Sequence, residues 1–201
     1  MNQKELLLSA ARIFEKATGF PVAFSGATVL KESTRSCVLR CYVDSQRTDI
    51  QTVILKQIKD DPARGFSDWA SLAFLANIPE VHSAVPQFYG GDAEANFYLM
   101  EDLGPIQTLE DFLAGNDLAA FEAAISGLAI KMARVSGATL HLEGAFDAIR
   151  SGLPAHQEIG HHCEAKAWMN KSSKILDWFT ALGCSAPPGF QPSLKTVFNT
   201  Y

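Results

Sequence analysis

The N-terminal segment carries the hydrophobic period of an amphipathic helix. Asn2 is a suitable N-cap, and Glu5 stands three residues later in the position that completes a capping box. Gly19, followed by Pro21, is typical of the end of a helix. Between these ends the apolar positions recur every three or four residues, at Leu6, Ala10, Ile13, Phe14 and Ala17. The pattern predicts a helix that ends at Gly19.

A β-rich block follows this helix. Three runs, at 22–30, 37–43 and 52–58, are rich in Val, Ile, Leu, Phe, Tyr and Cys. Two polar connections, 31–36 and 44–49, separate them. Short apolar runs joined by short polar connections favour an antiparallel meander of three strands.

A second helix and two more strands are expected after the meander. The helix is predicted over 66–77, with an apolar face that includes Trp69. The strands are predicted at 87–89 and 97–103, joined by a glycine-rich turn at 90–92. These elements complete a predicted sheet of five antiparallel strands.

After residue 107 the strand pattern gives way to helices. Thr108 and Asp111 cap a short helix, and a third helix is expected over 164–182. The last ten residues begin one more apolar helical face without a capping glycine or a polar tail, so we expect a truncated reading frame. The long helix between these segments has apolar residues at 3–4 spacing, at Leu118, Phe121, Ile125, Leu128, Met132 and Val135.

Composition excludes several functional classes. With 47% hydrophobic and 19% charged residues in 201, the chain has the balance of a globular protein rather than a disordered one. Charged residues interrupt every apolar stretch before the roughly 18 residues that a transmembrane helix needs. The net charge of −5 argues against general binding to nucleic acid or to anionic membranes. We expect a cytoplasmic protein, with neither a nucleic-acid nor a membrane partner.

The four cysteines fit a reducing compartment. Cys37 and Cys41 fall on one face of a predicted strand, about 13 Å apart. A disulfide requires Cα atoms within about 7 Å, so this pair is expected to be reduced. Cys163 and Cys184 flank a predicted helix without the spacing of a CxxC motif.

Lys56, on the third predicted strand, and Asp68, on the helix that follows it, form a candidate phosphate site. Lys56 and Ile54 point to the same face of the third predicted strand, which places a cation beside an apolar surface for a base. Asp68, on the next helix, is the candidate carboxylate that orients the lysine. Each residue also has an ordinary structural explanation, as a solvated lysine at a strand end and an acid favoured by the helix dipole.

Two further segments are candidates for contact with a nucleotide. The strand at 97–103 ends in the sequence Met100, Glu101, Asp102, Leu103, whose backbone groups could meet the edge of an adenine ring. The polar connection at 31–36 contains Ser33, Thr34 and Ser36, whose hydroxyl and N–H groups are candidates for covering phosphates. This connection has no glycine, so it differs from a typical phosphate-binding loop.

The order of these segments resembles a known family of enzymes. The segments concerned are 52–56, 66–75, 85–91, 98–104 and 139–141. Together they resemble the aminoglycoside phosphotransferase and choline-kinase-like family, which are small-molecule kinases with a protein-kinase-like fold. The resemblance extends over about residues 20–143.

The resemblance implies an α+β, protein-kinase-like fold in two parts. Residues 1–104 would be the nucleotide-binding lobe, with the N-terminal helix and the five-stranded antiparallel sheet, and residues 105–201 the start of a truncated helical substrate lobe. Lys56 would grip the phosphates of ATP, and Asp68 would be its partner, where the family normally has glutamate. Ile54 and the segment from Met100 to Leu103 would contact the adenine. The implied cofactors are ATP and Mg²⁺; the small-molecule acceptor is not readable from these residues.

The catalytic motif of such enzymes is absent from the sequence. A kinase of this kind uses a His-x-Asp loop, an Asn five residues after the Asp, and a further Asp for magnesium. None of the five histidines has Asp two positions later: His82, His141, His156, His161, His162. We therefore expect no catalytic residue and no magnesium ligand in this chain, and no phosphoryl transfer by it alone.

Other functional interpretations were weighed. A metal site at His156, His161, His162 and Cys163 lacks a second ligand pair with suitable spacing. Nucleophilic catalysis by Cys163 beside His162 lacks an orienting acid. The main alternative is a non-catalytic, kinase-like module that binds a nucleotide or a protein. In either case an incomplete helical lobe would expose apolar surface, and we expect self-association through it.

Overall fold

The computed structural model describes residues 2–45, 49–59, 62–115, 117–154 and 181. The chain divides into two units, Met1–Ala155 and His156–Tyr201, and the elements described below belong to the first. The predicted helix at 164–182, apart from residue 181, and the apolar residues at the end of the chain lie outside the described residues.

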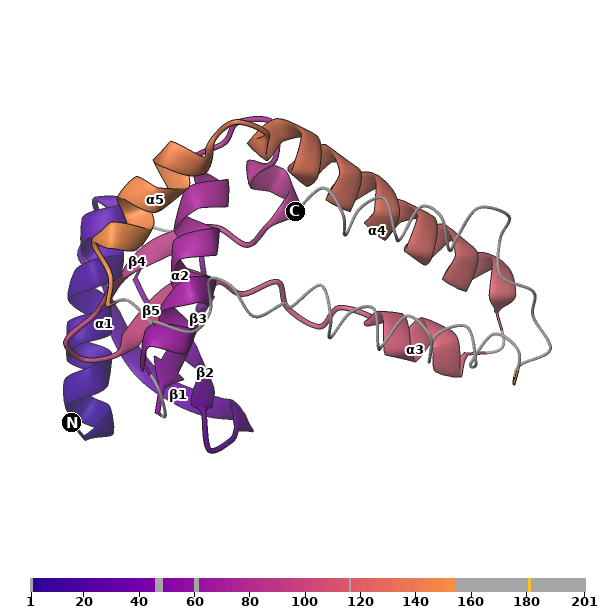
Figure 1. The fold of residues 1–201 in the computed structure, drawn as a ribbon. Helices are drawn as coiled ribbons and strands as arrows, with labels where there is room; N and C mark the ends of the chain where they lie inside the picture. Colours follow the sequence, from indigo (N-terminus) through magenta and orange to yellow (C-terminus); the bar gives the residue numbers. More distant parts are fainter. Residues whose placement is uncertain (1, 46–48, 60–61, 116, 155–180, 182–201) are drawn as a thin grey trace. The chain divides into compact units, whose positions relative to one another are not determined.

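The first unit is built on a five-stranded antiparallel sheet (Figure 1). The strands lie in the order β1-β2-β3-β5-β4, and each pair of neighbours is antiparallel. Their bounds are β1 Ala23–Glu32, β2 Ser36–Asp44, β3 Thr52–Ile58, β4 Phe88–Asp92 and β5 Phe97–Glu101. The fold is therefore α+β, and the predicted meander of β1, β2 and β3 is confirmed.

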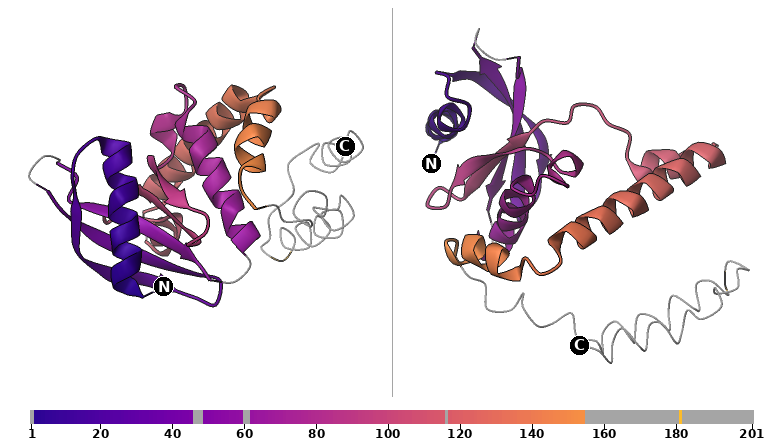
Figure 2. Two further views of the ribbon diagram at one scale, coloured as in Figure 1. Left: turned by 90° about the vertical axis from the view of Figure 1, so that its left-hand side faces the viewer. Right: turned by 90° about the horizontal axis from the view of Figure 1, so that it is seen from above.

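Helix α1 (Gln3–Thr18) covers one face of this sheet (Figure 2). The predicted capping box forms, because the Asn2 side chain accepts from the Glu5 N–H while the Glu5 carboxylate accepts from the Asn2 N–H. Gly19 ends the helix in the left-handed region, at φ 76°. The core beneath α1 consists of Leu6, Ala10, Phe14, Cys37, Leu39, Cys41, Val53, Leu55, Tyr89, Phe97 and Leu99.

Helix α2 (Pro62–Ala76) lies on the opposite face (Figure 2). Its Trp69 packs on Tyr98 and Phe88 of the sheet, at ring centroid distances of 6.1 and 6.0 Å. A separate buried cluster forms there from Ile58, Phe66, Trp69, Ala73 and Tyr98. Helices α1 and α2 thus pack on alternate residues of the same strands. Because successive side chains of a strand point to opposite faces, both faces of the central strands are apolar.

Three helices follow the sheet: α3 (Leu109–Ala114), α4 (Leu118–Thr139) and α5 (Glu143–Ser151). Thr108 and Asp111 cap α3 as predicted. Helix α5 and the C-terminal end of α4 pack on the C-terminal end of α2. There the ring centroids of Phe74 and Phe146 are 5.5 Å apart. Helix α5 was not predicted, because it is short and begins without a side-chain cap.

None of the residues in α3, α4 and α5 is buried. Large apolar side chains of this region are exposed, among them Leu113, Leu118, Ile125, Leu128, Ile130, Met132 and Leu140. The self-association expected from the sequence stays a prediction. Among the helices of the described ranges, none is both long and apolar enough to cross a bilayer.

The turn between β4 and β5 differs from the prediction. Strand β4 continues through Gly90 and Gly91, and the chain reverses at 93–96 instead of at 90–92. The pairing of β4 with β5 shifts register at Gly90, whose φ is 120°. Gly90 and Gly91 therefore belong to a β-bulge and not to the turn. The reversal is stabilised by the Asp92 carboxylate, which accepts from the N–H groups of Glu94 and Ala95.

The two strand cysteines agree with the prediction. Cys37 and Cys41 are free and buried, and both side chains lie in the core beneath α1. Burial raises the pKa of the Cys41 thiol to about 12, so this group is neutral at physiological pH.

Candidate functional site

The structure brings Lys56 of β3 and Asp68 of α2 together. The Lys56 Nζ and the Asp68 Oδ2 are 2.5 Å apart. Strand alternation directs Lys56 toward the face that α2 covers, and Asp68 lies one residue before the buried Trp69 on that helix. The lysine side chain is 22% exposed and the aspartate 57%, so the pair lies at the edge of the core with one side open to solvent. The geometry predicted for this pair is present.

The ring of Tyr98 of β5 lies beneath the Lys56 ammonium group. Tyr98 is the register partner of Lys56 on the adjacent strand, and the Lys56 Nζ lies 5.9 Å from the centre of its ring. Burial alone would lower the pKa of Lys56, but the hydrogen bond to Asp68 and the interactions with Tyr98 raise it above its ordinary value. Lys56 is therefore a fixed cation at physiological pH, which suits it to bind an anion.

An apolar surface adjoins this cation. Ile54, two residues before Lys56 on the same face, is 7% exposed. Its register partners are Arg40 of β2 and Met100 of β5, and Met100 packs against the Trp69 and Tyr98 cluster. Lys56, Ile54 and Met100 thus share one face of the sheet.

Asp102, just after β5, is held in an ion pair that the sequence analysis did not find. Its two oxygens accept from Arg40 Nε at 2.5 Å and Nη2 at 3.0 Å, and Oδ1 also accepts from the Gly104 N–H at 2.9 Å. The Asp102 side chain is 4% exposed. The hydrogen bond from Arg40 lowers the pKa of Asp102 below its ordinary value despite the opposing effect of burial, and the bond from Gly104 adds to this. Asp102 is therefore a fixed carboxylate that ties β2 to the segment after β5.

A signal for this pair was present in the sequence. Arg40 stands in the middle of an apolar strand, and a charged residue at such a position needs an oppositely charged partner. The sequence alone could not say which acid that partner is, because the strand pairing that brings residues 40 and 102 together was not known.

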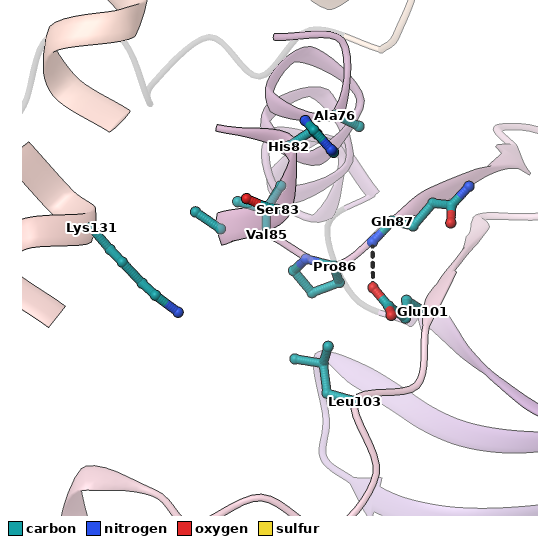
Figure 3. Close-up of a pocket in the computed structure, with 10 residues that line it drawn as sticks. Ala76, His82, Ser83, Val85, Pro86, Gln87, Glu101, Leu103 and Lys131 are labelled. Atoms are coloured by element: carbon teal, nitrogen blue, oxygen red, sulfur yellow. Dashed lines mark hydrogen bonds between the residues drawn. The ribbon is translucent and has the colours of Figure 1, made fainter. Parts of the chain in front are cut away.

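Glu101 and Leu103 face a different space from Lys56. Glu101 is opposite Val53 in register, so its side chain leaves the face opposite to that of Ile54. Its Oε2 accepts from the Gln87 N–H at 3.0 Å (Figure 3). A pocket of about 600 Å³ lies beside it, and α4 contributes Lys131 to the opposite wall (Figure 3). Neither Lys56 nor Asp68 lines this pocket. The structure therefore divides the candidate adenine-contact residues between two places, with Met100 on the face of Lys56 and Glu101 and Leu103 in this pocket.

The connection at 33–36 forms a closed turn. The Ser33 N–H donates to the Ser36 carbonyl at 2.9 Å, and the Ser33 Oγ accepts from the N–H groups of Arg35 and Ser36. Half of the groups proposed to cover phosphates are thus engaged within the turn itself, namely both groups of Ser33 and the Ser36 N–H. Thr34 is the candidate at its tip whose groups take no part in these bonds.

No metal site is found in the part of the chain that the structure describes. No group of three or more His, Cys, Asp or Glu side chains lies close enough there to hold an ion. The cluster weighed from the sequence, at His156, His161, His162 and Cys163, falls outside the described residues.

Comparison with models of known protein families and with curated proteins gave no match. The arrangement of Lys56, Asp68 and their neighbours is therefore the basis for a functional assignment.

Proposed function

We propose that residues 1–104 bind a nucleoside triphosphate, as the nucleotide lobe of a kinase-like, ATP-dependent phosphotransferase that acts on a small-molecule hydroxyl. The observation that carries this proposal is the ion pair between Lys56 and Asp68. In protein kinases, a lysine on the third strand of the sheet contacts the phosphates and pairs with an acid on the following helix. This chain has the same relation between a lysine on β3 and an acid on α2.

Each group has a separate role in this proposal. The Lys56 ammonium contacts phosphate oxygens, and Asp68 keeps that ammonium in place. Ile54 provides an apolar surface for the base. Of the segment from Met100 to Leu103, the backbone beyond the end of β5, at Asp102 and Leu103, meets the edge of the base, because Met100 and Glu101 are paired within the sheet. The Arg40–Asp102 pair fixes the start of that segment relative to β2.

The implied cofactors are ATP and Mg²⁺. Mg²⁺ prefers carboxylate oxygens and water, and it neutralises phosphate charge when bound. The described residues offer no cluster of acids for it. Within the described part of the chain, the proposal therefore assigns phosphate binding to Lys56 alone.

A second candidate function is a non-catalytic module with the same nucleotide site. The observation that favours it is the lack of a His-x-Asp motif at any of the five histidines. Reading the genomic frame beyond codon 201 distinguishes the two. A downstream His-x-Asp motif with an Asn five residues after the Asp, and a later Asp, supports the enzyme. A stop codon in several independent clones supports the module.

Titration with a fluorescent ATP analogue tests the nucleotide site. Loss of a hydrogen bond to a charged group costs about 1.5–3 kcal/mol, so Lys56→Ala should weaken binding by roughly tenfold to a hundredfold. Asp68→Asn should weaken it less, because the cation remains. Lys59→Ala is the matched control, since Lys59 also forms an ion pair, with Glu32, but stands just beyond the end of β3. Equal affinity of the wild type and Lys56→Ala would exclude the assigned role.

A further inference from the structure

A groove lies between the first half of α1 and the beginning of β1. Its volume is about 580 Å³. Most of its lining is apolar, from the side chains of Leu7, Leu8, Ala11, Val22 and Phe24. Leu8 is 56% exposed, so the groove presents apolar surface to solvent. None of these residues belongs to the candidate nucleotide site.

One wall of the groove is the free edge of the sheet. Strand β1 stands at the end of the strand order, and in the described sheet it pairs with β2 alone. Alternate N–H and C=O groups of an edge strand point away from the sheet and are available to another strand. A Cβ placed on Gly26, which also lines the groove, would have no neighbour within 4 Å, so the face of the strand is open at this residue.

The charge of the groove is positive. Lys4 is the one charged side chain among its lining residues. Further along this side of α1 an exposed cation and an exposed acid, Arg12 and Glu15, offset each other, so the positive charge rests on Lys4. Among the residues that the structure describes, no acidic side chain lines the groove, so an occupant with carboxylates complements it.

We propose that this groove binds an extended acidic peptide, which adds to the edge of β1 as a further strand. In strand addition, main-chain hydrogen bonds supply affinity, and pockets for alternate side chains supply specificity. Because residues i and i+2 of a strand point to the same side, the side of the peptide that faces the groove carries apolar residues against Leu7, Leu8 and Phe24 and, two residues away, a carboxylate near Lys4. Register shifts at Phe24/Gly26 and Val29/Lys31 interrupt regular pairing along β1, so the peptide segment is short, on the order of five residues.

This inference does not depend on the proposed nucleotide site. Helix α1 and the groove lie on one face of the sheet, whereas Lys56 points to the face that α2 covers. The two sites can therefore be tested separately on the same protein.

The test uses the full chain and a fluorescent hexapeptide with blocked ends, in which valine, glutamate and valine alternate with threonine, so that the glutamate and both valines share one side of the strand. Fluorescence anisotropy should show saturable binding. Leu8→Glu, which adds negative charge at an exposed position, should weaken it at least tenfold and leave binding of the ATP analogue unchanged. Leu118→Glu is the matched control, because Leu118 is an exposed leucine on α4 outside the groove, and it should bind the peptide as the wild type does.

Two peptide controls examine the mode of binding. The same hexapeptide with lysine in place of the glutamate should bind at least tenfold more weakly, since its charge is reversed. Two versions of the acidic peptide, N-methylated at every second residue in opposite phases, test the main-chain bonds. Because only one set of N–H groups faces β1, at least one version should lose binding.

Several results would overturn the proposal. These are no saturable binding of the acidic peptide at millimolar concentration, equal binding by Leu8→Glu, or full binding by both N-methylated peptides. Light scattering of the chain without peptide can give one further result that overturns the proposal. A dimer that Leu8→Glu converts to a monomer would show that a second copy of the chain occupies the groove in place of a peptide.

Discussion

Replacing Phe14 by alanine tests whether α1 is an integral part of the sheet domain. The Phe14 ring is fully buried. It contacts Tyr89 edge to face at 4.8 Å and Phe24 at 6.1 Å. Phe14 is thus the largest side chain by which α1 is attached to the sheet, and its removal leaves a cavity between the two.

The size of the effect follows from this burial. Phe→Ala substitutions in a core cost about 3–5 kcal/mol, which includes both the lost transfer free energy and the cavity. The lost ring pairs place Phe14→Ala in the upper part of that range. With a urea m-value of about 2 kcal/mol/M, the midpoint of unfolding should fall by about 2 M.

Urea unfolding followed by far-UV circular dichroism measures this shift. Phe20→Ala is the matched control, because Phe20 lies just after α1 and is 41% exposed. It should lower the free energy of unfolding by less than about 1 kcal/mol. If the two variants had the same midpoint, the packing of α1 on the sheet in solution would differ from that described above.

Three further predictions concern stability and reactivity. Asp102→Asn should destabilise the protein at pH 6. Because the pKa of Asp102 is lowered in the folded state, the stability that this carboxylate contributes is lost on acidification. In urea titrations the difference in free energy of unfolding from the wild type should therefore shrink below about pH 4. Cys41 should resist iodoacetamide at pH 8 until the protein unfolds, as peptide mass spectrometry would show. Gly91→Ala should lower the thermal midpoint, since a Cβ there would lie 2.6 Å from the Trp69 ring, whereas Gly127→Ala, in an open position on α4, should not.

Several features of the sheet domain could be predicted because they depend on local sequence. The capping box at Asn2 and the end of α1 at Gly19 need only neighbouring residues. Strands β1, β2 and β3 were found within one or two residues of their ends, because polar connections separate apolar runs. Gly90 and Gly91 were misplaced in a turn, since a glycine pair fits a bulge as well as a reversal until the pairing of β4 with β5 is known.

The candidate site shows the same difference between features that local sequence predicts and features that depend on strand pairing. Lys56 and Asp68 were identified from the pattern, because each falls on a definite face of a strand or a helix. The partner of Asp102 was not identified, and the opposite directions of Met100 and Glu101 were not considered, because both depend on how β5 is inserted beside β3.

The sequence by itself determined most of the segments that form helices and strands, α5 excepted, and which side chains share a face, because hydrophobic period, capping residues and glycine act over a few residues. Only the tertiary structure decided the strand order, the Arg40–Asp102 pair, the separation of Glu101 from Lys56 and the groove beside β1. These features join residues that are distant in the chain. Their free energy comes from packing and charge pairing between elements, which a local pattern does not contain.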